Sequence, residues 1–198
     1  MSTKAERTKA FIIEKTSSVF NQKGVVGTSL SDITEATGLT KGAIYGNFAD
    51  KEEVALAAFE YNVDKVFSGL AEAMSHSVTS VDKLKAVTGF YRTYFAAEKY
   101  KYGCPMANTA TECDDTHPAL QAKVKGRYFK WRKGIEIILN EGIANGEFKH
   151  DVDVKAFANL MIVTIQGAIV VSKATADESF VAAPMDFLDS VIESYRLK

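Results

Sequence analysis

The sequence predicts an all-α protein in which a small N-terminal helical module precedes a larger helical body. Apolar residues recur at spacings of three and four along most of the chain, as they do on one face of an α-helix. No run alternates between apolar and polar residues for long enough to indicate a β-sheet. The first proline is Pro105, so the N-terminal half lacks the residue that most often interrupts helices.

The composition is typical of a soluble globular protein. The chain has 198 residues, of which 46% are hydrophobic and 25% charged, and its net charge is -1 at pH 7. Two cysteines do not make a disulfide framework, and the N-terminus lacks the apolar run of a signal peptide. The most apolar stretch, residues 160–171, is shorter than the roughly 20 residues of a membrane span. We therefore expect a cytoplasmic protein without a membrane segment.

The expected helices change in character near residue 50. Before it they are short and separated by glycines, with a first helix around residues 10–20 and two short segments at 30–38 and 39–46. This change predicts two domains, residues 1–50 and 51–198. The later helices are expected at residues 50–75, 80–98, 105–113, 118–144, 152–173 and 185–197.

The most informative stretch is residues 28–48. Ser29 can cap a helix, with Asp32 at the third helical position reaching back to it. Gly38 can supply a left-handed turn, and Thr40 can cap a second short helix. Two short helices joined by such a turn are the pattern of a helix-turn-helix. The outer face of the second helix is thin and polar, as entry into a DNA major groove requires, and carries Lys41, Gly42, Tyr45 and Asn47.

Lys51 occupies an unusual place at the start of the next helix. Asp50 and Glu53 can form a capping box there, which puts Lys51 in the first helical turn. The positive end of the helix dipole disfavours a cation at this point. Lys51 is therefore either a solvated side chain or one that meets an anion such as a DNA phosphate.

Residues 8–55 resemble the DNA-binding domain of the TetR family of bacterial transcriptional repressors. The resemblance implies an all-helical homodimer with a ligand-binding C-terminal body, released from a palindromic double-stranded operator by an effector. It rests on ungapped matches at Phe20, Gly24 and Thr28, at Leu39-Thr40-Lys41-Gly42-Ala43-Ile44-Tyr45 with Phe48, and at Lys51-Glu52-Glu53.

The resemblance also implies roles for individual residues of the module. Ile44 and Phe48 are expected to pack inside it. The first 51 residues carry seven Lys or Arg against five Asp or Glu, which predicts few phosphate contacts per subunit. The residues expected to touch phosphates are Thr28, Ser29, Tyr45 and Lys51. The residues expected to face base edges are Thr40, Lys41, Gly42 and Asn47.

The body is rich in aromatic side chains, some of them four residues apart on one helix. Core packing accounts for most of them. Buried tyrosine hydroxyls need partners, however, so the alternative is an effector cavity with an aromatic wall and a few polar tips. The resemblance to the TetR family favours this alternative. The expected lining residues are Phe67, Phe90, Tyr94, Met106, Tyr128 and Trp131.

The Gly103-Cys104-Pro105 turn is the second informative site. Pro105 suits the first position of a helix, which puts Cys104 at the N-cap, where a thiol pKa is lowered. Lys99 and Lys101 lie close in sequence and would add to this effect. The turn is similar to one in a TetR subgroup, some of whose members sense oxidants or electrophiles through cysteine, and by that resemblance Lys173 is a candidate neighbour. The alternative is a small buried cysteine that fills a gap.

Metal and cofactor sites are not expected. The run of Glu112, Cys113, Asp114, Asp115 and His117 fits no zinc spacing. Capping of the following helix by Asp115 or Thr116 explains the polar residues more simply.

Enzymatic activity is not expected either. His76, His117 and His150 are far apart and have no nucleophile motif beside them, and no glycine-rich phosphate loop is present. The remaining alternative to a DNA-binding regulator is a helical adaptor that binds protein and not DNA.

The last two expected helices are apolar around much of their circumference. A helix of this kind is buried on all sides, which in a small chain favours a subunit interface. Two helices from each subunit would then form a four-helix bundle that makes the homodimer. We place Ile165 and Val191 in this interface, where Gly167 would permit a close approach of helices.

Overall fold

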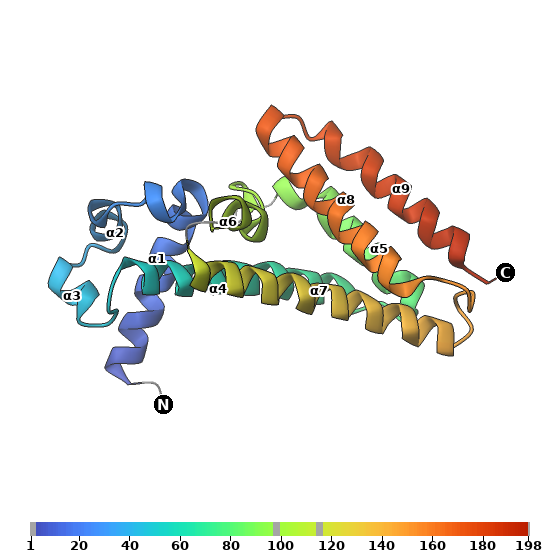
Figure 1. Cartoon of the computed structure of the whole chain (residues 1–198), viewed down its shortest axis with the longest axis horizontal. Coiled ribbons are helices and arrows are strands. Elements are labelled where there is room, and N and C mark those ends of the chain that lie inside the picture. Colours follow the sequence, from blue (N-terminus) through green and yellow to red (C-terminus); the bar gives the residue numbers. More distant parts are fainter. Residues whose placement is uncertain (1–2, 97–99, 114–116, 198) are drawn as a thin grey trace. The chain divides into compact units, whose positions relative to one another are not determined.

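A computed structural model describes residues 3–96, 100–113 and 117–197, and within these ranges the regular elements are helices (Figure 1). The expected all-α fold class is therefore confirmed. In chain order the elements are α1 (Lys4–Gly27), α2 (Leu30–Thr37), α3 (Lys41–Tyr45), α4 (Lys51–Met74), α5 (Ser80–Arg92), a 3-10 turn (Tyr94–Ala96), α6 (Pro105–Cys113), α7 (Pro118–Ala144), α8 (Val154–Thr175) and α9 (Ser179–Tyr195).

The chain packs as two compact units. The first unit consists of Met1–Val66 and Pro105–Val124, and the second of Phe67–Cys104 and Lys125–Lys198. The first unit takes in the beginning of α4 and all of α6 in addition to the N-terminal helices. A domain boundary at residue 50 stays a prediction.

The first unit is organised by local capping signals. Ser29 and Asp32 form the expected capping box at the start of α2. Gly38 ends α2 in the left-handed conformation, with φ 68°, and Thr40 caps α3. The turn-forming residues named from the sequence thus build the two short helices as expected. Ile12, Ile33 and Ile44 are fully buried in the core of this unit, and Phe48 is buried as expected.

The second unit is built around α5, α8 and α9. Figure 1 shows α8 and α9 side by side, and both have a buried apolar face that includes Phe157, Met161 and Leu188. The unit also holds a cluster of aromatic rings from α4, α5, the 3-10 turn and α7. By length and composition alone, helix α8 is long and apolar enough to cross a membrane. The apolar stretch noted in the sequence, residues 160–171, was shorter than a membrane span. Its buried face packs inside the unit, as that of a core helix does.

Several helix boundaries differ from expectation. The first helix, expected around residues 10–20, is longer at both ends and runs over Lys4–Gly27. The expected helix at residues 80–98 ends at Arg92, because Thr93 leaves the helical conformation with φ -106° and ψ 14°. The expected helix at residues 185–197 begins earlier, at Ser179, and contains Pro184. Proline removes one backbone hydrogen bond, but the buried side chains of Val181 and Met185 on either side anchor the helix.

Candidate nucleic-acid interface and sensor site

The short helix α3 presents its outer face to solvent. The Thr40 hydroxyl accepts a hydrogen bond from the Ala43 backbone N–H at 3.2 Å and fixes the start of the helix. Ile44 anchors the opposite face in the core, while Lys41 and Gly42 are exposed. A β-carbon at Gly42 would meet nothing closer than the Thr40 hydroxyl, at 4.0 Å. The outer face is therefore thin enough for close approach to another molecule.

The start of α2 is held by charge as well as by capping. The Ser29 N–H and hydroxyl both donate to the Asp32 carboxylate at 2.7 Å, and Lys23 pairs with the same side chain at 2.6 Å. The Lys23 and Ser29 hydrogen bonds hold the pKa of Asp32 well below its usual range. Asp32 thus stays ionised and keeps Ser29 exposed at the helix start.

Thr28 is buried at the end of α1. Its side chain is 0% exposed, and its hydroxyl donates to the Gly24 carbonyl at 2.6 Å. The hydroxyl therefore closes the end of α1. A contact between Thr28 and a phosphate stays a prediction.

Lys51 has acceptors inside the protein. Its Nζ donates to the carbonyls of Val25 at 2.7 Å and Thr28 at 2.8 Å. These carbonyls lie at the C-terminal end of α1, where the negative end of the helix dipole favours a cation. Two neutral backbone carbonyls thus accept hydrogen bonds from the Lys51 ammonium. A contact between Lys51 and a phosphate stays a prediction.

The other expected DNA-contacting side chains divide by exposure. Ser29 and Thr40 are exposed, while Tyr45 and Asn47 are half-buried. The Asn47 amide donates to the Ala43 carbonyl at 2.8 Å, so part of its hydrogen-bonding capacity is used to end α3. The roles of these residues toward bases and phosphates stay predictions.

Cys104 lies directly before α6, as expected, and is 1% exposed. Its sulfur accepts a hydrogen bond from the Gln166 amide at 3.4 Å, and the Tyr128 hydroxyl donates to the same Gln166 side chain at 3.3 Å. Neither cysteine is in a disulfide, and Cys113 is also buried. Lys99 lies outside the described residues.

Lys173 lies against the turn before Cys104. Gly103 has φ 84°, and a β-carbon there would be 2.7 Å from Cδ of Lys173. Burial lowers the pKa of Lys173, while the nearby Cys104 acts in the opposite direction. A cleft of about 330 Å³ opens beside these residues and is lined by Phe95, Lys101, Ser172, Lys173, Ala176 and Glu178.

The expected aromatic wall exists in part as a ring cluster. Phe90 packs edge-on against Tyr94 at 5.8 Å between ring centroids, and Phe67 packs against Trp131 at 6.4 Å. Tyr91, which sequence reasoning left out of the wall, stacks on Tyr94 at 5.4 Å. The spacing of three residues between Tyr91 and Tyr94 is the sequence signal that could have placed Tyr91 in the wall.

Two buried hydroxyls of this cluster have no hydrogen-bond partner among the residues that the structure describes. They belong to Tyr91 and Tyr94, and burial raises the pKa of both phenols. Met106 belongs to α6 in the first unit, and none of the six expected lining residues borders the cleft beside Lys173. An effector cavity with those six residues stays a prediction.

The described part of the chain holds no group of three or more His, Cys, Asp or Glu side chains arranged to bind a metal ion. Asp114, Asp115 and the expected capping residue Thr116 lie outside that part.

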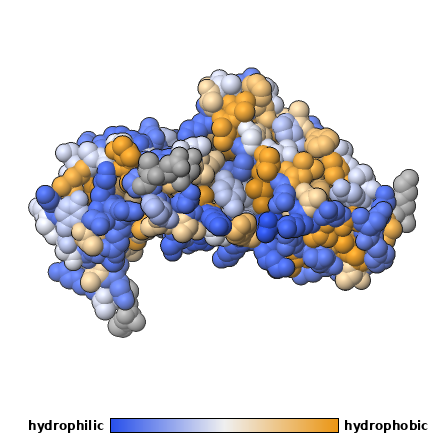
Figure 2. All heavy atoms as spheres, viewed as in Figure 1, coloured by the Kyte–Doolittle hydropathy of each residue, from blue (hydrophilic) through white to orange (hydrophobic). Residues whose placement is uncertain are grey.

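A strip of apolar side chains is exposed along α8 and α9, and hydrophobic residues are visible over these helices in Figure 2. The most exposed are Val163 at 69% and Phe187 at 54%. Ile165, which the sequence placed in a subunit interface, is 0% exposed within one subunit. Apolar periodicity does not distinguish the side of a helix that faces its own core from the side that remains outside. The exposed strip comprises Leu160, Val163, Val170, Val171, Phe180 and Phe187.

These features define a helix-turn-helix protein that binds DNA and carries a separate helical body. Two family models match the chain: "Bacterial regulatory proteins, tetR family" over residues 12–58, and "Tetracyclin repressor-like, C-terminal domain" over residues 80–187. The chain belongs to the TetR family of bacterial transcriptional regulators. The family consists of regulators and not of enzymes, in agreement with the sequence.

Individual relatives agree with this assignment over nearly the whole chain. The crystal structure of a TetR-family regulator from Cytophaga hutchinsonii is 40% identical, with a TM-score of 0.93, and the match covers 100% of this chain and 99% of that one. A TetR regulator from Chloroflexus aurantiacus J-10-FL is 35% identical, with a TM-score of 0.93 and coverage of 98% and 99%. The HTH-type transcriptional repressor DhaR of Mycobacterium sp. (strain GP1) is 26% identical over 92% of this chain and 89% of its own.

Proposed function

We propose that the protein is a cytoplasmic homodimeric repressor that binds a palindromic DNA operator and leaves it when an effector acts on its helical body. The effector is a small molecule or a thiol-reactive compound. The DNA-binding part of this proposal rests on the exposed outer face of α3. Lys41 and Gly42 lie there, beside the capped start of the helix. The name of DhaR as a repressor supports repression over activation.

Each subunit contributes one α3 to a half-site. Lys41 is the side chain best placed to read a base edge, because it is exposed in the first turn and Gly42 beside it leaves room. We assign further base contacts to the backbone at Gly42 and to the side chains of Thr40 and Asn47. Phosphate contacts are assigned to Ser29, Tyr45 and Lys51.

The dimer forms through α8 and α9. A contiguous apolar strip of this kind marks an interaction surface, and a second copy buries it with two helices from each subunit. Two recognition helices must then lie one DNA turn apart, about 34–36 Å. An effector releases DNA if it binds better to a dimer with a different separation. Helix α4 contributes residues to both units and is the lever for such a change.

The effector acts at one of two places. In the first, a small molecule enters among the aromatic rings and meets the unpartnered hydroxyls of Tyr91 and Tyr94. In the second, a thiol-reactive compound modifies Cys104, with Lys173 as the neighbouring amine. The burial of Cys104 means that reaction requires opening of the turn, and the cleft beside Lys173 provides an approach to it.

Selection of duplexes from a random pool by the purified full-length protein tests the DNA-binding part. We expect enrichment of a palindrome whose binding falls steeply with salt concentration and is weakened by Lys41→Ala. Failure to enrich any duplex, with the protein folded and dimeric, would instead support a helical adaptor that binds protein. Footprinting with candidate small molecules or N-ethylmaleimide then identifies the effector class.

A further inference from the structure

The end of α1 is not a continuous helix. Gly24 has φ 72° and ψ 179°, so residues 25–27 form a separate turn that leads into the helix-turn-helix. Backbone N–H groups at the start of such a turn have no helical carbonyl to pair with. Another group must therefore satisfy the N–H groups of Val25 and Val26.

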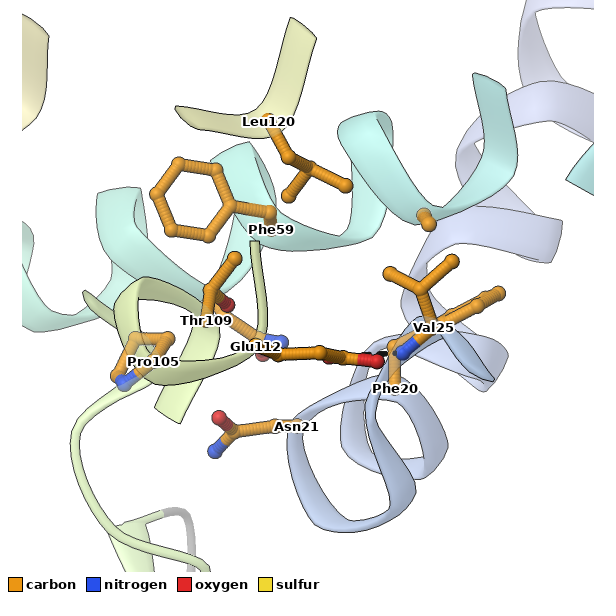
Figure 3. A pocket seen from close by; sticks show the side chains of 10 residues that line it. Phe20, Asn21, Val25, Phe59, Pro105, Thr109, Glu112 and Leu120 are labelled. Atoms are coloured by element: carbon orange, nitrogen blue, oxygen red, sulfur yellow. Dashed lines mark hydrogen bonds between the residues drawn. The ribbon is translucent and has the colours of Figure 1, made fainter. Parts of the chain in front are cut away.

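That group is the side chain of Glu112, in the last turn of α6. Its carboxylate accepts hydrogen bonds from the Val25 N–H at 2.9 Å and the Val26 N–H at 2.8 Å, and Figure 3 shows it reaching across to this turn. A carboxylate at a helix start also interacts favourably with the positive end of the dipole. We name this arrangement, formed by Glu112 with the N–H groups of Val25 and Val26, the Glu112 clamp.

The carboxylate of the clamp packs closely against Gly24. A β-carbon at Gly24 would lie 2.5 Å from the Glu112 carboxylate. One turn earlier on α6, the Asn108 amide donates to the carbonyl and side-chain oxygens of Asn21 at 3.1 and 3.0 Å. The cavity beside Glu112 measures about 20 Å³, enough for roughly one water molecule (Figure 3). A shift of α6 therefore has to move or break the clamp.

The opposite face of the same turn is held by Lys51, which binds the carbonyls of Val25 and Thr28. The turn is thus gripped by a carboxylate from α6 on its N–H groups and by an ammonium from α4 on its carbonyls. The segment that follows begins α2 at Ser29. Two charged side chains, one from α4 and one from α6, thus contact the turn that leads into the helix-turn-helix.

We propose that Glu112 is a positioning residue for DNA binding, and that the Glu112 clamp passes the position of α6 to the helix-turn-helix. Helix α6 begins at Pro105, directly after Cys104, and has Glu112 in its last turn. A short helix is stiff, so a displacement at one end reaches the other. The second part of this inference rests on the proposed release of DNA through Cys104, and the first part does not.

The test measures how strictly the full-length dimer requires one half-site separation. Duplexes selected with the unaltered protein are remade with the half-sites one base pair closer and one base pair farther apart. Affinities are then compared for the unaltered protein and for Glu112→Ala. The matched control is Glu60→Gln, which loses a charge from an ion pair with Lys123 in the same unit.

We expect Glu112→Ala to weaken binding to the selected duplex about tenfold and to flatten the dependence on half-site separation. Glu112→Gln keeps one acceptor oxygen, so its affinity should fall between those of the unaltered protein and Glu112→Ala. Glu60→Gln should retain the strict separation. If Glu112→Ala lowers thermal stability but keeps the same preference for separation, the residue is merely structural and the proposal is overturned.

Gly24→Ala is the second variant, since its β-carbon displaces the same carboxylate. It should flatten the preference in the same way. In the double variant, only the backbone strain of alanine at position 24 should add to the effect of Glu112→Ala. Full additivity of the two changes would contradict a shared clamp. This variant keeps the test decisive if Glu112→Ala fails to fold.

The coupling part is tested with N-ethylmaleimide, which adds a thiol across its carbon–carbon double bond. We expect the reagent to release DNA from the unaltered protein and to have less effect on Glu112→Gln. Equal release from both would overturn the coupling role of the clamp. No release from the unaltered protein would overturn both the thiol-reactive proposal and the coupling part that depends on it, and the half-site experiment would decide the positioning part on its own.

Discussion

The two units differ in how they satisfy their buried polar groups. In the first unit, the turns around the helix-turn-helix are fixed by side chains that cap backbone groups, as at Ser29, Thr40 and Lys51. In the second unit, apolar and aromatic packing dominates. Among the described residues, three of the four buried side-chain atoms without a hydrogen-bond partner belong to it: Tyr91, Tyr94 and Ser172.

This difference corresponds to two tasks. A DNA-reading module needs one geometry, and directional hydrogen bonds specify one geometry. A body that responds to an effector gains from buried polar groups without hydrogen-bond partners, because a ligand can supply those partners. The exposed apolar strip on α8 and α9 is a further surface without a partner in one subunit, which the proposed second subunit would cover.

The largest expected effect comes from placing a charge in that strip. Val163→Asp should give monomers and abolish operator binding, because an unpaired charge in a dry interface costs about 3–5 kcal/mol. Sedimentation measures the state of association. Val78→Asp is the matched control, since Val78 is 90% exposed outside the strip and should leave the dimer intact. An unchanged dimer in Val163→Asp would show that the strip serves another purpose.

The next effect separates Lys41 from Lys51 within the first unit. Lys41→Ala should reduce discrimination between bases by about 1–3 kcal/mol and leave thermal stability nearly unchanged. Lys51→Ala should lower the free energy of unfolding by about 1–3 kcal/mol, since it leaves two backbone carbonyls without their charged donor. Lys51→Ala should also weaken DNA binding, by a similar factor for every DNA sequence tested. Equal thermal stability of the two variants would contradict the role of Lys51 at the end of α1.

A smaller effect tests the unsatisfied hydroxyls. Tyr91→Phe and Tyr94→Phe each remove a buried group that lacks a partner, so the free energy of unfolding should stay the same or rise by about 1 kcal/mol. Calorimetry of the apo protein measures this. A loss of more than about 1 kcal/mol would mean that the hydroxyls are hydrogen-bonded in solution, for instance to water.

The smallest expected effect concerns the cysteines. Cys104→Ser should change stability by about 1 kcal/mol or less and leave operator affinity nearly unchanged, while it blunts release by N-ethylmaleimide. Cys113→Ser should matter less, because Cys113 ends α6 and does not precede a helix start. Mass spectrometry of the modified protein identifies which thiol reacts. Preferential labelling of Cys113 would reverse the assignment.

Local features were predictable from the sequence, and long-range ones were not. The capping roles of Ser29, Gly38 and Thr40 follow from neighbours within a few residues, and the structure has them as expected. The contact of Glu112 with Val25 joins residues 87 apart in sequence, so no local pattern indicates it. The burial of Thr28 and Ile165 likewise depends on tertiary packing, which decides which side of a helix faces inward.

The close approach at Gly24 makes residues 24 and 112 dependent on each other in evolution and in protein engineering. A side chain at position 24 meets the carboxylate of Glu112 and must also adopt a left-handed conformation. A library that varies both positions should therefore retain glycine with glutamate as a pair. A change at only one of the two positions would disturb the contact between them. Homologues are therefore expected to change both residues together.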